Sequence, residues 1–204
     1  MIPKRKPMLC SRASVKNSVR MVSVWTTPYA VALGADSDAR TACSTVRTRT
    51  LFGPARAATS SYIAPAHFDS AARVAIDLIA LRPLPGEEKT VTEQDPPKGV
   101  IKWLTVGKLL VLPGMSCNEG GSFEHQAADI LGRITVCLRE AGCGWSEVCD
   151  VTLVHEHGVQ HNDIQASLRK VTEEIPPRMT LLPAEGYSRP GKLLEIETMA
   201  IMNV

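Results

Sequence analysis

The second half of the chain alternates apolar and polar residues with clear periods. WLTVGKLLVLPG, residues 103–114, reads as two extended pieces around Gly107-Lys108, with Pro113-Gly114 ending the second. From 126 to 141 the apolar positions recur at helical spacing, three and four residues apart, and Gly142 is a natural helix stop. The pattern predicts a β-hairpin followed by an amphipathic helix.

Three further elements complete this half. VCDVTLV, residues 148–154, is rich in β-branched residues and predicts a strand. Ile164, Leu168 and Val171 share one face of a helix predicted over 163–174, which Asn162 or Asp163 can cap and Pro176-Pro177 would stop. The last strand is predicted over 192–202. The order ββ, α, β, α, β predicts an α+β domain, a small sheet with two helices on one face.

The first half is harder to interpret. Residues 84–99 are rich in Pro, Gly and charge and predict a linker or long loop, whereas 21–27 is a strand candidate and 38–52 a poor, Thr-rich helix candidate. AIDLIAL at 75–81 aligns with EIETMAI at 195–201, which indicates an internal repeat. We therefore expect a basic tail (1–20), a partial repeat (21–83), a linker (84–99) and one complete domain (100–204).

Composition places the chain among folded soluble proteins, with 44% apolar and 22% charged residues. No apolar run is long enough to span a membrane. Residues 1–99 hold 14 Lys/Arg against 8 Asp/Glu, and the rest 9 against 13, so the basic charge gathers at the N-terminus. That tail is either a solvated segment, a nucleic-acid arm or a mitochondrial presequence. Few aromatic residues argue against nucleic-acid binding, and we expect a cytoplasmic protein or, alternatively, a mitochondrial one.

Cysteines and histidines offer the other candidate chemistry. Six cysteines in a chain without a secretion signal are expected to be reduced, and Cys137, Cys143 and Cys149 lack the spacing of a zinc site. HEHGVQH brings together His155, His157 and His161, which suit zinc or copper but are more typical of surface histidines. We predict no metal. The chain also lacks the phosphate-binding and serine-nucleophile motifs GxGxxG, GxxxxGK[ST] and GxSxG.

Several of these motifs together resemble one known family. A Gln-led helix ending in Ala-Gly, an Asp-Val strand, the turn PPRMTLLP and the strand LLEIETMAI resemble the reactive intermediate deaminase (RidA, YjgF-type) family over about residues 100–202. Weaker traces over 20–83 suggest a degenerate second copy. The resemblance implies a chorismate-mutase-like α+β fold, assembly as a trimer, and ligand pockets between neighbouring sheets. It also implies hydrolysis of enamines or imines, such as 2-aminoacrylate, without a cofactor.

Two residues match the family's catalytic positions. Arg178 matches the arginine that holds the substrate carboxylate, for which a planar guanidinium is well suited. Glu195 matches the acid that positions water, and such a carboxyl group can move protons between water and the leaving ammonia. Glu195 and Glu197 lie two residues apart on a predicted strand, so we expect both on one face, where they can line one pocket.

Other substrate-binding positions follow from the same resemblance. Gly114 matches the glycine of the second strand, Thr180 stands where the family often has Cys, and Gln165 stands near its Asn. In the partial copy, Arg56 keeps the arginine and Ala75 replaces the acid. Val100, Ile101 and Pro113 replace the family's polar residues around the pocket, so a more apolar pocket is expected.

These residues leave three hypotheses of function. The first is an enzyme that transforms a small carboxylate-bearing enamine or imine. The second is a biosynthetic relative acting on a larger, apolar substrate. The third is a non-catalytic ligand-binding or oligomerisation module. In each case we expect a homo-oligomer, either the family's trimer or a dimer of tandem repeats, that binds no nucleic acid or membrane.

Overall fold

The computed structural model describes residues 27–35, 57–63, 74–81, 83–94, 101–117, 119–171, 179–187 and 190–203. Their strands are β1 (Thr27–Ala35), β2 (Ala58–Ile63), β3 (Val74–Leu81), β4 (Lys89–Glu93), β5 (Ile101–Val106), β6 (Leu109–Ser116), β7 (Val148–Glu156), β8 (Met179–Ala184), β9 (Gly186–Tyr187) and β10 (Leu194–Ile201). The helices are α2 (Phe123–Glu140), α3 (His161–Val171) and the short 3-10 helix η3 (Trp145–Glu147). The tail 1–20, the helix candidate 38–52 and Pro176-Pro177 lie outside the described residues, as does the strand candidate 21–27 except for Thr27.

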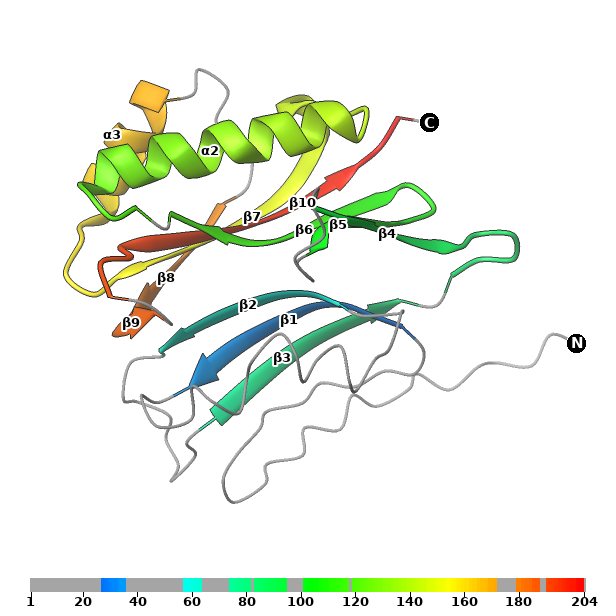
Figure 1. Ribbon diagram of the computed structural model, residues 1–204, viewed down its shortest axis with the longest axis horizontal. Coiled ribbons are helices and arrows are strands. Elements are labelled where there is room, and N and C mark those ends of the chain that lie inside the picture. The colour runs from blue at the N-terminus through cyan, green and yellow to red at the C-terminus, as the bar shows by residue number, and fades with distance from the viewer. Residues whose placement is uncertain are drawn as a thin grey trace, which may run out of the picture.

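The strands form two sheets that face each other. One has the order β4-β5-β6-β10-β7-β8 and the other the order β3-β1-β2-β9. Figure 1 shows α2 and α3 covering one face of the six-stranded sheet, while the four-stranded sheet lies against its other face. The predicted sheet with two helices on one face is therefore present, and its opposite face is covered by the N-terminal sheet of the same chain.

The hairpin predicted around Gly107-Lys108 is confirmed as β5 and β6, and Gly107 has a φ of 51°. The predicted end of its second strand at Pro113-Gly114 is wrong, because β6 continues to Ser116. Ile196 of β10 pairs with Met115 and Thr198 pairs with Leu112, so Pro113-Gly114 forms a bulge opposite Glu197. The β5 pairing of β6 ends at Val111, so the missing N–H of Pro113 breaks no bond on that side.

The segment 84–99, predicted as a linker or long loop, contains a strand. Residues 89–93 form β4, which pairs antiparallel with β5 at the edge of the six-stranded sheet. The sequence KTVTE has β-branched residues at its centre, and Val91 packs against the small cluster around Leu104. The sequence pattern did not predict this edge strand, because it has only five residues and prolines and charged residues flank it.

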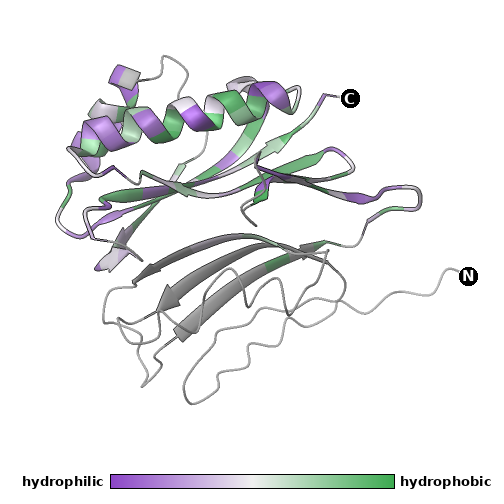
Figure 2. Cartoon of the chain, viewed as in Figure 1, coloured by the Kyte–Doolittle hydropathy of each residue, from purple (hydrophilic) through white to green (hydrophobic). Residues whose placement is uncertain are grey.

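Both predicted helices are confirmed with shifted ends. Ser122 caps α2 by accepting a hydrogen bond from the backbone N–H of His125 at 3.2 Å, and Gly142 ends it with a φ of 80°. The buried face of α2 carries Ile130, Ile134 and Leu138, which pack on β6 and β10 in the main core. Figure 2 shows hydrophobic and hydrophilic residues alternating along this helix, as an amphipathic helix on a sheet requires. Among the described residues, neither helix has the length and apolar character needed to cross a membrane.

Candidate functional site

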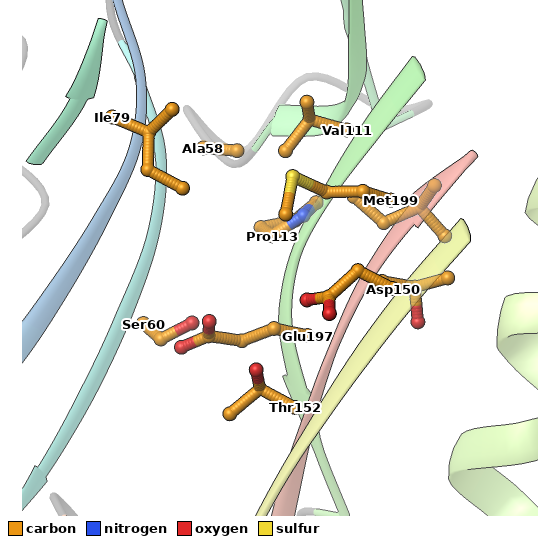
Figure 3. A pocket seen from close by; sticks show the side chains of 11 residues that line it. Ala58, Ser60, Ile79, Val111, Pro113, Asp150, Thr152, Glu197 and Met199 are labelled. Atoms are coloured by element: carbon orange, nitrogen blue, oxygen red, sulfur yellow. The ribbon is translucent and has the colours of Figure 1, made fainter. Parts of the chain in front are cut away.

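A small cavity lies between the two sheets. Its volume is ≈ 90 Å³, about the space of three water molecules. The four-stranded sheet contributes one side and strands β6, β7 and β10 contribute the other. Lining it are Ala58, Ser60, Ile79, Val111, Leu112, Pro113, Asp150, Thr152, Glu197, Thr198 and Met199. Figure 3 shows the labelled side chains around the cavity, with the carboxylates of Glu197 and Asp150 among them.

The acidic side chains of β10 face the N-terminal sheet, because successive side chains of a strand point to opposite faces of its sheet. Leu194 and Ile196 pack into the main core beneath the helices. Glu195 and Glu197 therefore point to the opposite face, toward the N-terminal sheet. Glu195 is 4% exposed, whereas Glu197 is half-buried and lines the cavity. The expectation that both lie on one face agrees with this arrangement.

Gly114 brings Glu195 close to the N-terminal sheet. A Cβ at this glycine would collide with Oε1 of Glu195 and with Oγ of Ser60. Both oxygens thus lie directly over the glycine, one from β10 and the other from β2. Among the sequence-predicted site residues, the structure brings together Glu195 and Gly114.

Asp150 and Thr152 are polar cavity residues that the sequence analysis did not identify. They alternate along β7 with Val151 and Leu153, which are buried in the main core, so they face the cavity instead. Their register partners on β10 are Met199 for Asp150 and Glu197 for Thr152. The sequence VCDVTLV shows the alternation of apolar and polar residues, but it does not show which strand pairs with β7, so it could not place Asp150 and Thr152 beside β10. Ser60 was missed as well, because nothing in the sequence shows that β2 faces β10.

The other predicted site residues lie elsewhere or outside the described part. Thr180 is exposed on β8, where it pairs with Thr152 of β7. Gln165 is exposed on α3, in the helical layer, and does not line the cavity. Arg178 and Arg56 lie outside the described residues. The substrate-binding roles of all four stay predictions.

The histidine motif differs from a cluster of surface histidines. His157 and His161 are exposed, but His155 is only 3% exposed because it lies on the helix-facing side of β7. Its Nδ1 lies 3.0 Å from the backbone oxygen of Glu156, and its ring centroid lies 5.9 Å from that of His161. Within the described residues, no group of three or more His, Cys, Asp or Glu side chains is arranged to hold a metal ion.

The four cysteines of the described part are free thiols. Cys117 and Cys137 are buried, Cys143 is half-buried and Cys149 is exposed. Burial raises the pKa of Cys137, of Cys143 and of Cys149 above that of an ordinary thiol. Since the thiolate is the reactive form, these three cysteines are poor nucleophiles at neutral pH.

Comparisons with known proteins support the fold. No protein-family model matches the chain, and no curated protein matches it. A protein of unknown function from Pseudomonas aeruginosa, PA3499, is similar in structure with a TM-score of 0.51 and 18% identity over 58% of this chain and 95% of that one. Rv2704 from Mycobacterium tuberculosis, a member of the highly conserved YjgF/YER057c/UK114 family, has a TM-score of 0.46 and 21% identity over 56% of this chain and 100% of its own. YyfA from Yersinia pestis, of the conserved Rid protein family, has a TM-score of 0.48 and 18% identity over the same shares.

These similarities span little more than half of the chain. The mixed six-stranded sheet with two helices confirms the predicted α+β fold, and the similarity to PA3499 supports it. The 18% identity to PA3499 shows a shared fold alone, so the activity has to be argued from the site itself.

Proposed function

We propose, from the premise that this chain has the fold of the YjgF/YER057c/UK114 family, that it hydrolyses a small enamine or imine bearing a carboxylate. The observation that carries the proposal is the position of Glu195. Its carboxylate is almost fully buried, faces the second sheet, and lies beside a cavity with polar and apolar sides. A buried carboxyl group next to a substrate-sized space is what proton transfer to and from a small molecule requires.

The chemistry assigned to Glu195 is transfer of the water proton. In the imine form, water attacks the carbon of the C=N bond and gives a proton to the carboxylate. The carboxyl group returns that proton to the nitrogen, which gives the neutral carbinolamine. The carboxylate then takes the proton of the new hydroxyl group and passes it to the nitrogen, so the C=O bond forms while the C–N bond breaks and ammonia leaves. The products are a keto acid and ammonia, and the glutamate ends in its starting state. No electron leaves or enters the substrate, so the reaction needs no oxidant or reductant.

Arg178 is assigned as the carboxylate anchor on the basis of the family resemblance. In the chain it directly precedes β8, the neighbour of β7 that carries Asp150 and Thr152. A guanidinium binds a carboxylate through two parallel hydrogen bonds, which would orient the adjacent C=N carbon. Thr180, Gln165 and Arg56 remain secondary candidates for substrate contacts.

The size of the cavity favours a small substrate over a large apolar one. Pockets for drug-sized ligands generally measure about 300–1,000 Å³, several times the ≈ 90 Å³ found here. A three-carbon enamine has six heavy atoms and is near the scale of the cavity. The volume of this cavity, which described residues line, therefore supports the deaminase hypothesis over the biosynthetic one.

The test couples the purified protein to an enzyme that releases 2-aminoacrylate and follows keto-acid formation. The wild-type chain should accelerate the reaction. Glu195→Gln keeps the shape and removes the proton-transfer group, so its rate enhancement should fall by roughly 10²-fold or more. Arg178→Ala should raise KM and lower kcat/KM, because the anchor is lost.

Matched controls separate the site from the rest of the surface. Glu156→Gln removes an exposed carboxylate at the end of β7, and Arg169→Ala removes an exposed arginine on α3. Both should behave as wild type. A wild-type protein that leaves the rate unchanged, or a Glu195→Gln variant as active as wild type, contradicts the proposed function and favours a non-catalytic module. Light scattering of the same samples tests the proposed homo-oligomer, as a trimer or a dimer.

A further inference from the structure

The cavity between the sheets has a polar end and an apolar end. Figure 3 shows the side chains of Ser60, Thr152 and Glu197 gathered on one side of it. The opposite side is lined by four apolar side chains, those of Ala58, Ile79, Val111 and Met199. A molecule that fills this cavity therefore needs its polar groups at one end and an apolar substituent at the other.

The polar end lies on the side of the proposed proton-transfer group. Oγ of Ser60 and Oε1 of Glu195 would both collide with a Cβ at Gly114, so these two oxygens are neighbours. Ser60 is also part of the cavity wall. We therefore expect the reacting C=N group of a substrate beside Ser60, with the rest of its carbon chain directed toward the apolar end.

Three of the four apolar residues are held in place by the protein core. Ala58 and Val111 are each 1% exposed and belong to the buried cluster that includes Leu104, and Met199 packs against the same cluster. A change in the size of any of these side chains would leave a void or force an overlap within the cluster. Ala58, Val111 and Met199 therefore give the apolar end a fixed inner wall.

Ile79 differs from these three residues because it lies at the boundary between the cavity and the solvent. It belongs to β3, which stands at the end of the strand order of the four-stranded sheet, and it pairs with Ala30 of β1. Its side chain lines the cavity but is also 44% exposed. A substituent too long for the cavity meets the Ile79 side chain before it reaches the solvent on that side.

We propose that Ile79 of the N-terminal sheet determines the specificity of this site by limiting the length of the ligand's apolar substituent. The volume of ≈ 90 Å³ is near the size of a three-carbon imine and leaves no space for the longer homologues. A methylene group that an apolar pocket cannot accommodate costs about 10–200-fold in discrimination. The inference rests on the proposed function for the identity of the substrate, whereas the length limit applies to any ligand of the cavity.

The first experiment measures kcat/KM of the full chain for two imines that an amino-acid oxidase releases in the assay, one from alanine with three carbons and one from norvaline with five. The wild type should favour the three-carbon imine at least tenfold. Ile79→Ala removes three carbons from the cavity wall, so it should raise kcat/KM for the five-carbon imine, relative to the three-carbon one, at least tenfold. Because both values come from one protein sample, a smaller folded fraction leaves their ratio unchanged.

Leu81→Ala is the matched control, since it also removes three carbons from an apolar residue of β3. Leu81 lies two residues after Ile79 and therefore on the same face of the strand. It is 38% exposed and is not among the residues that line the cavity. This variant should keep the wild-type ratio, whereas Ile79→Phe, with its larger side chain, should strengthen the preference for the three-carbon imine.

The second experiment measures binding and requires no reaction. Propanamide and pentanamide have the same uncharged polar head and differ in the length of the apolar chain. Titrations on the full chain, followed by the isotope-labelled methyl groups of Val111 and Met199, give the binding midpoint of each amide. Ile79→Ala should lower the pentanamide midpoint, relative to the propanamide midpoint, at least tenfold, and Leu81→Ala should leave this ratio unchanged.

The two experiments separate a failure of this inference from a failure of the proposed hydrolysis. An Ile79→Ala variant that keeps the wild-type ratio of kcat/KM, or of binding midpoints if the wild type is inactive, overturns the role of Ile79. An equal change of the ratio in Leu81→Ala also overturns it, because the effect would then come from β3 as a whole. An inactive wild type whose length limit for amides is relieved by Ile79→Ala contradicts only the hydrolysis. A wild type that neither reacts nor binds either amide contradicts both.

Discussion

Ser60 of β2 and Glu195 of β10 meet over a single backbone position, the α-carbon of Gly114. These residues are far apart in the sequence and belong to different sheets, yet each would touch a methyl group at that glycine. The glycine is therefore the point at which the six-stranded sheet approaches the N-terminal sheet closely.

The first prediction concerns this close approach. Gly114→Ala should destabilise the chain by about 1–3 kcal/mol, because the new methyl group forces β2 away from β6. The end of the Glu195 side chain can rotate, but Ser60 Cβ, 2.7 Å from the new atom, is fixed to its strand. Urea unfolding measures the loss.

Gly132→Ala is the matched control for that substitution. This glycine lies on the exposed side of α2, and a Cβ there meets nothing within 4 Å. The alanine should stabilise the helix by about 1 kcal/mol, since glycine is a poor helix former. If both variants change the free energy of unfolding in the same direction, the two sheets do not pack as closely at Gly114 as we infer.

A second prediction concerns Gln126, a fully buried polar residue on α2. Its amide donates to the backbone oxygens of Gly121 at 3.1 Å and Gly191 at 2.8 Å, and its oxygen accepts from the N–H of Leu193 at 2.9 Å. Gln126→Leu leaves these backbone groups without their partner, so we expect a loss of at least about 2 kcal/mol in denaturant unfolding. Gln165→Leu, on the exposed side of α3, should change stability little. An equal loss of stability in both variants would contradict the contribution assigned to the hydrogen bonds of Gln126.

The fold was predictable from sequence where one face of an element is fully buried. The 126–141 pattern identified α2 because every third or fourth residue enters the core, and VCDVTLV identified β7 by its alternation. Edge strand β4 was missed because it is short and surrounded by Pro and charge. The continuation of β6 through Pro113 was missed because a bulge, which depends on the partner strand, accommodates the proline.

The site was predictable only in part, for a physical reason. Glu195 and Glu197 belong to one strand, so the period of two places them on one face without knowledge of the fold. Asp150 lies beside Met199 only because β7 pairs with β10, and Ser60 lies there only because the two sheets pack face to face. Such contacts depend on strand order and sheet packing, which residue types do not encode locally.

A third prediction concerns acid stability and Glu147. The backbone N–H of Gly144 and the hydroxyl of Ser146 hold the pKa of this carboxyl below its usual value. Since the folded pKa lies below the unfolded one, the carboxylate stabilises the fold above the unfolded pKa, and this contribution disappears as pH falls through the folded pKa. Glu147→Gln should lower the melting temperature at pH 7 and less at pH 3, relative to wild type. Equal losses of melting temperature at pH 7 and at pH 3 would contradict this contribution of the Glu147 carboxylate.

A fourth prediction concerns Lys89 at the start of β4. Burial lowers the pKa of its ammonium to about 8, so a substantial fraction is the neutral amine at pH 8. An acylating reagent should therefore modify Lys89 faster than the exposed Lys108, as measured by mass spectrometry of timed samples. Equal rates would contradict the lowered pKa. Because an unfolded lysine titrates near 10.5, the unfolded chain binds more protons between these values, and stability should rise with pH across that interval.

The pairing of β9 with β2 has a consequence for how the protein is made. Tyr187 and Gly186 add the final strand to a sheet whose other members all come from the first 81 residues. On the ribosome, that sheet therefore waits for its last member until residue 187 has been synthesised, long after β3 has been completed. The N-terminal strands emerge early with an unfilled edge, and exposed edges readily pair with other chains. Synthesis speed and chaperone protection of the nascent N-terminal half should thus decide how much of the protein reaches its native state.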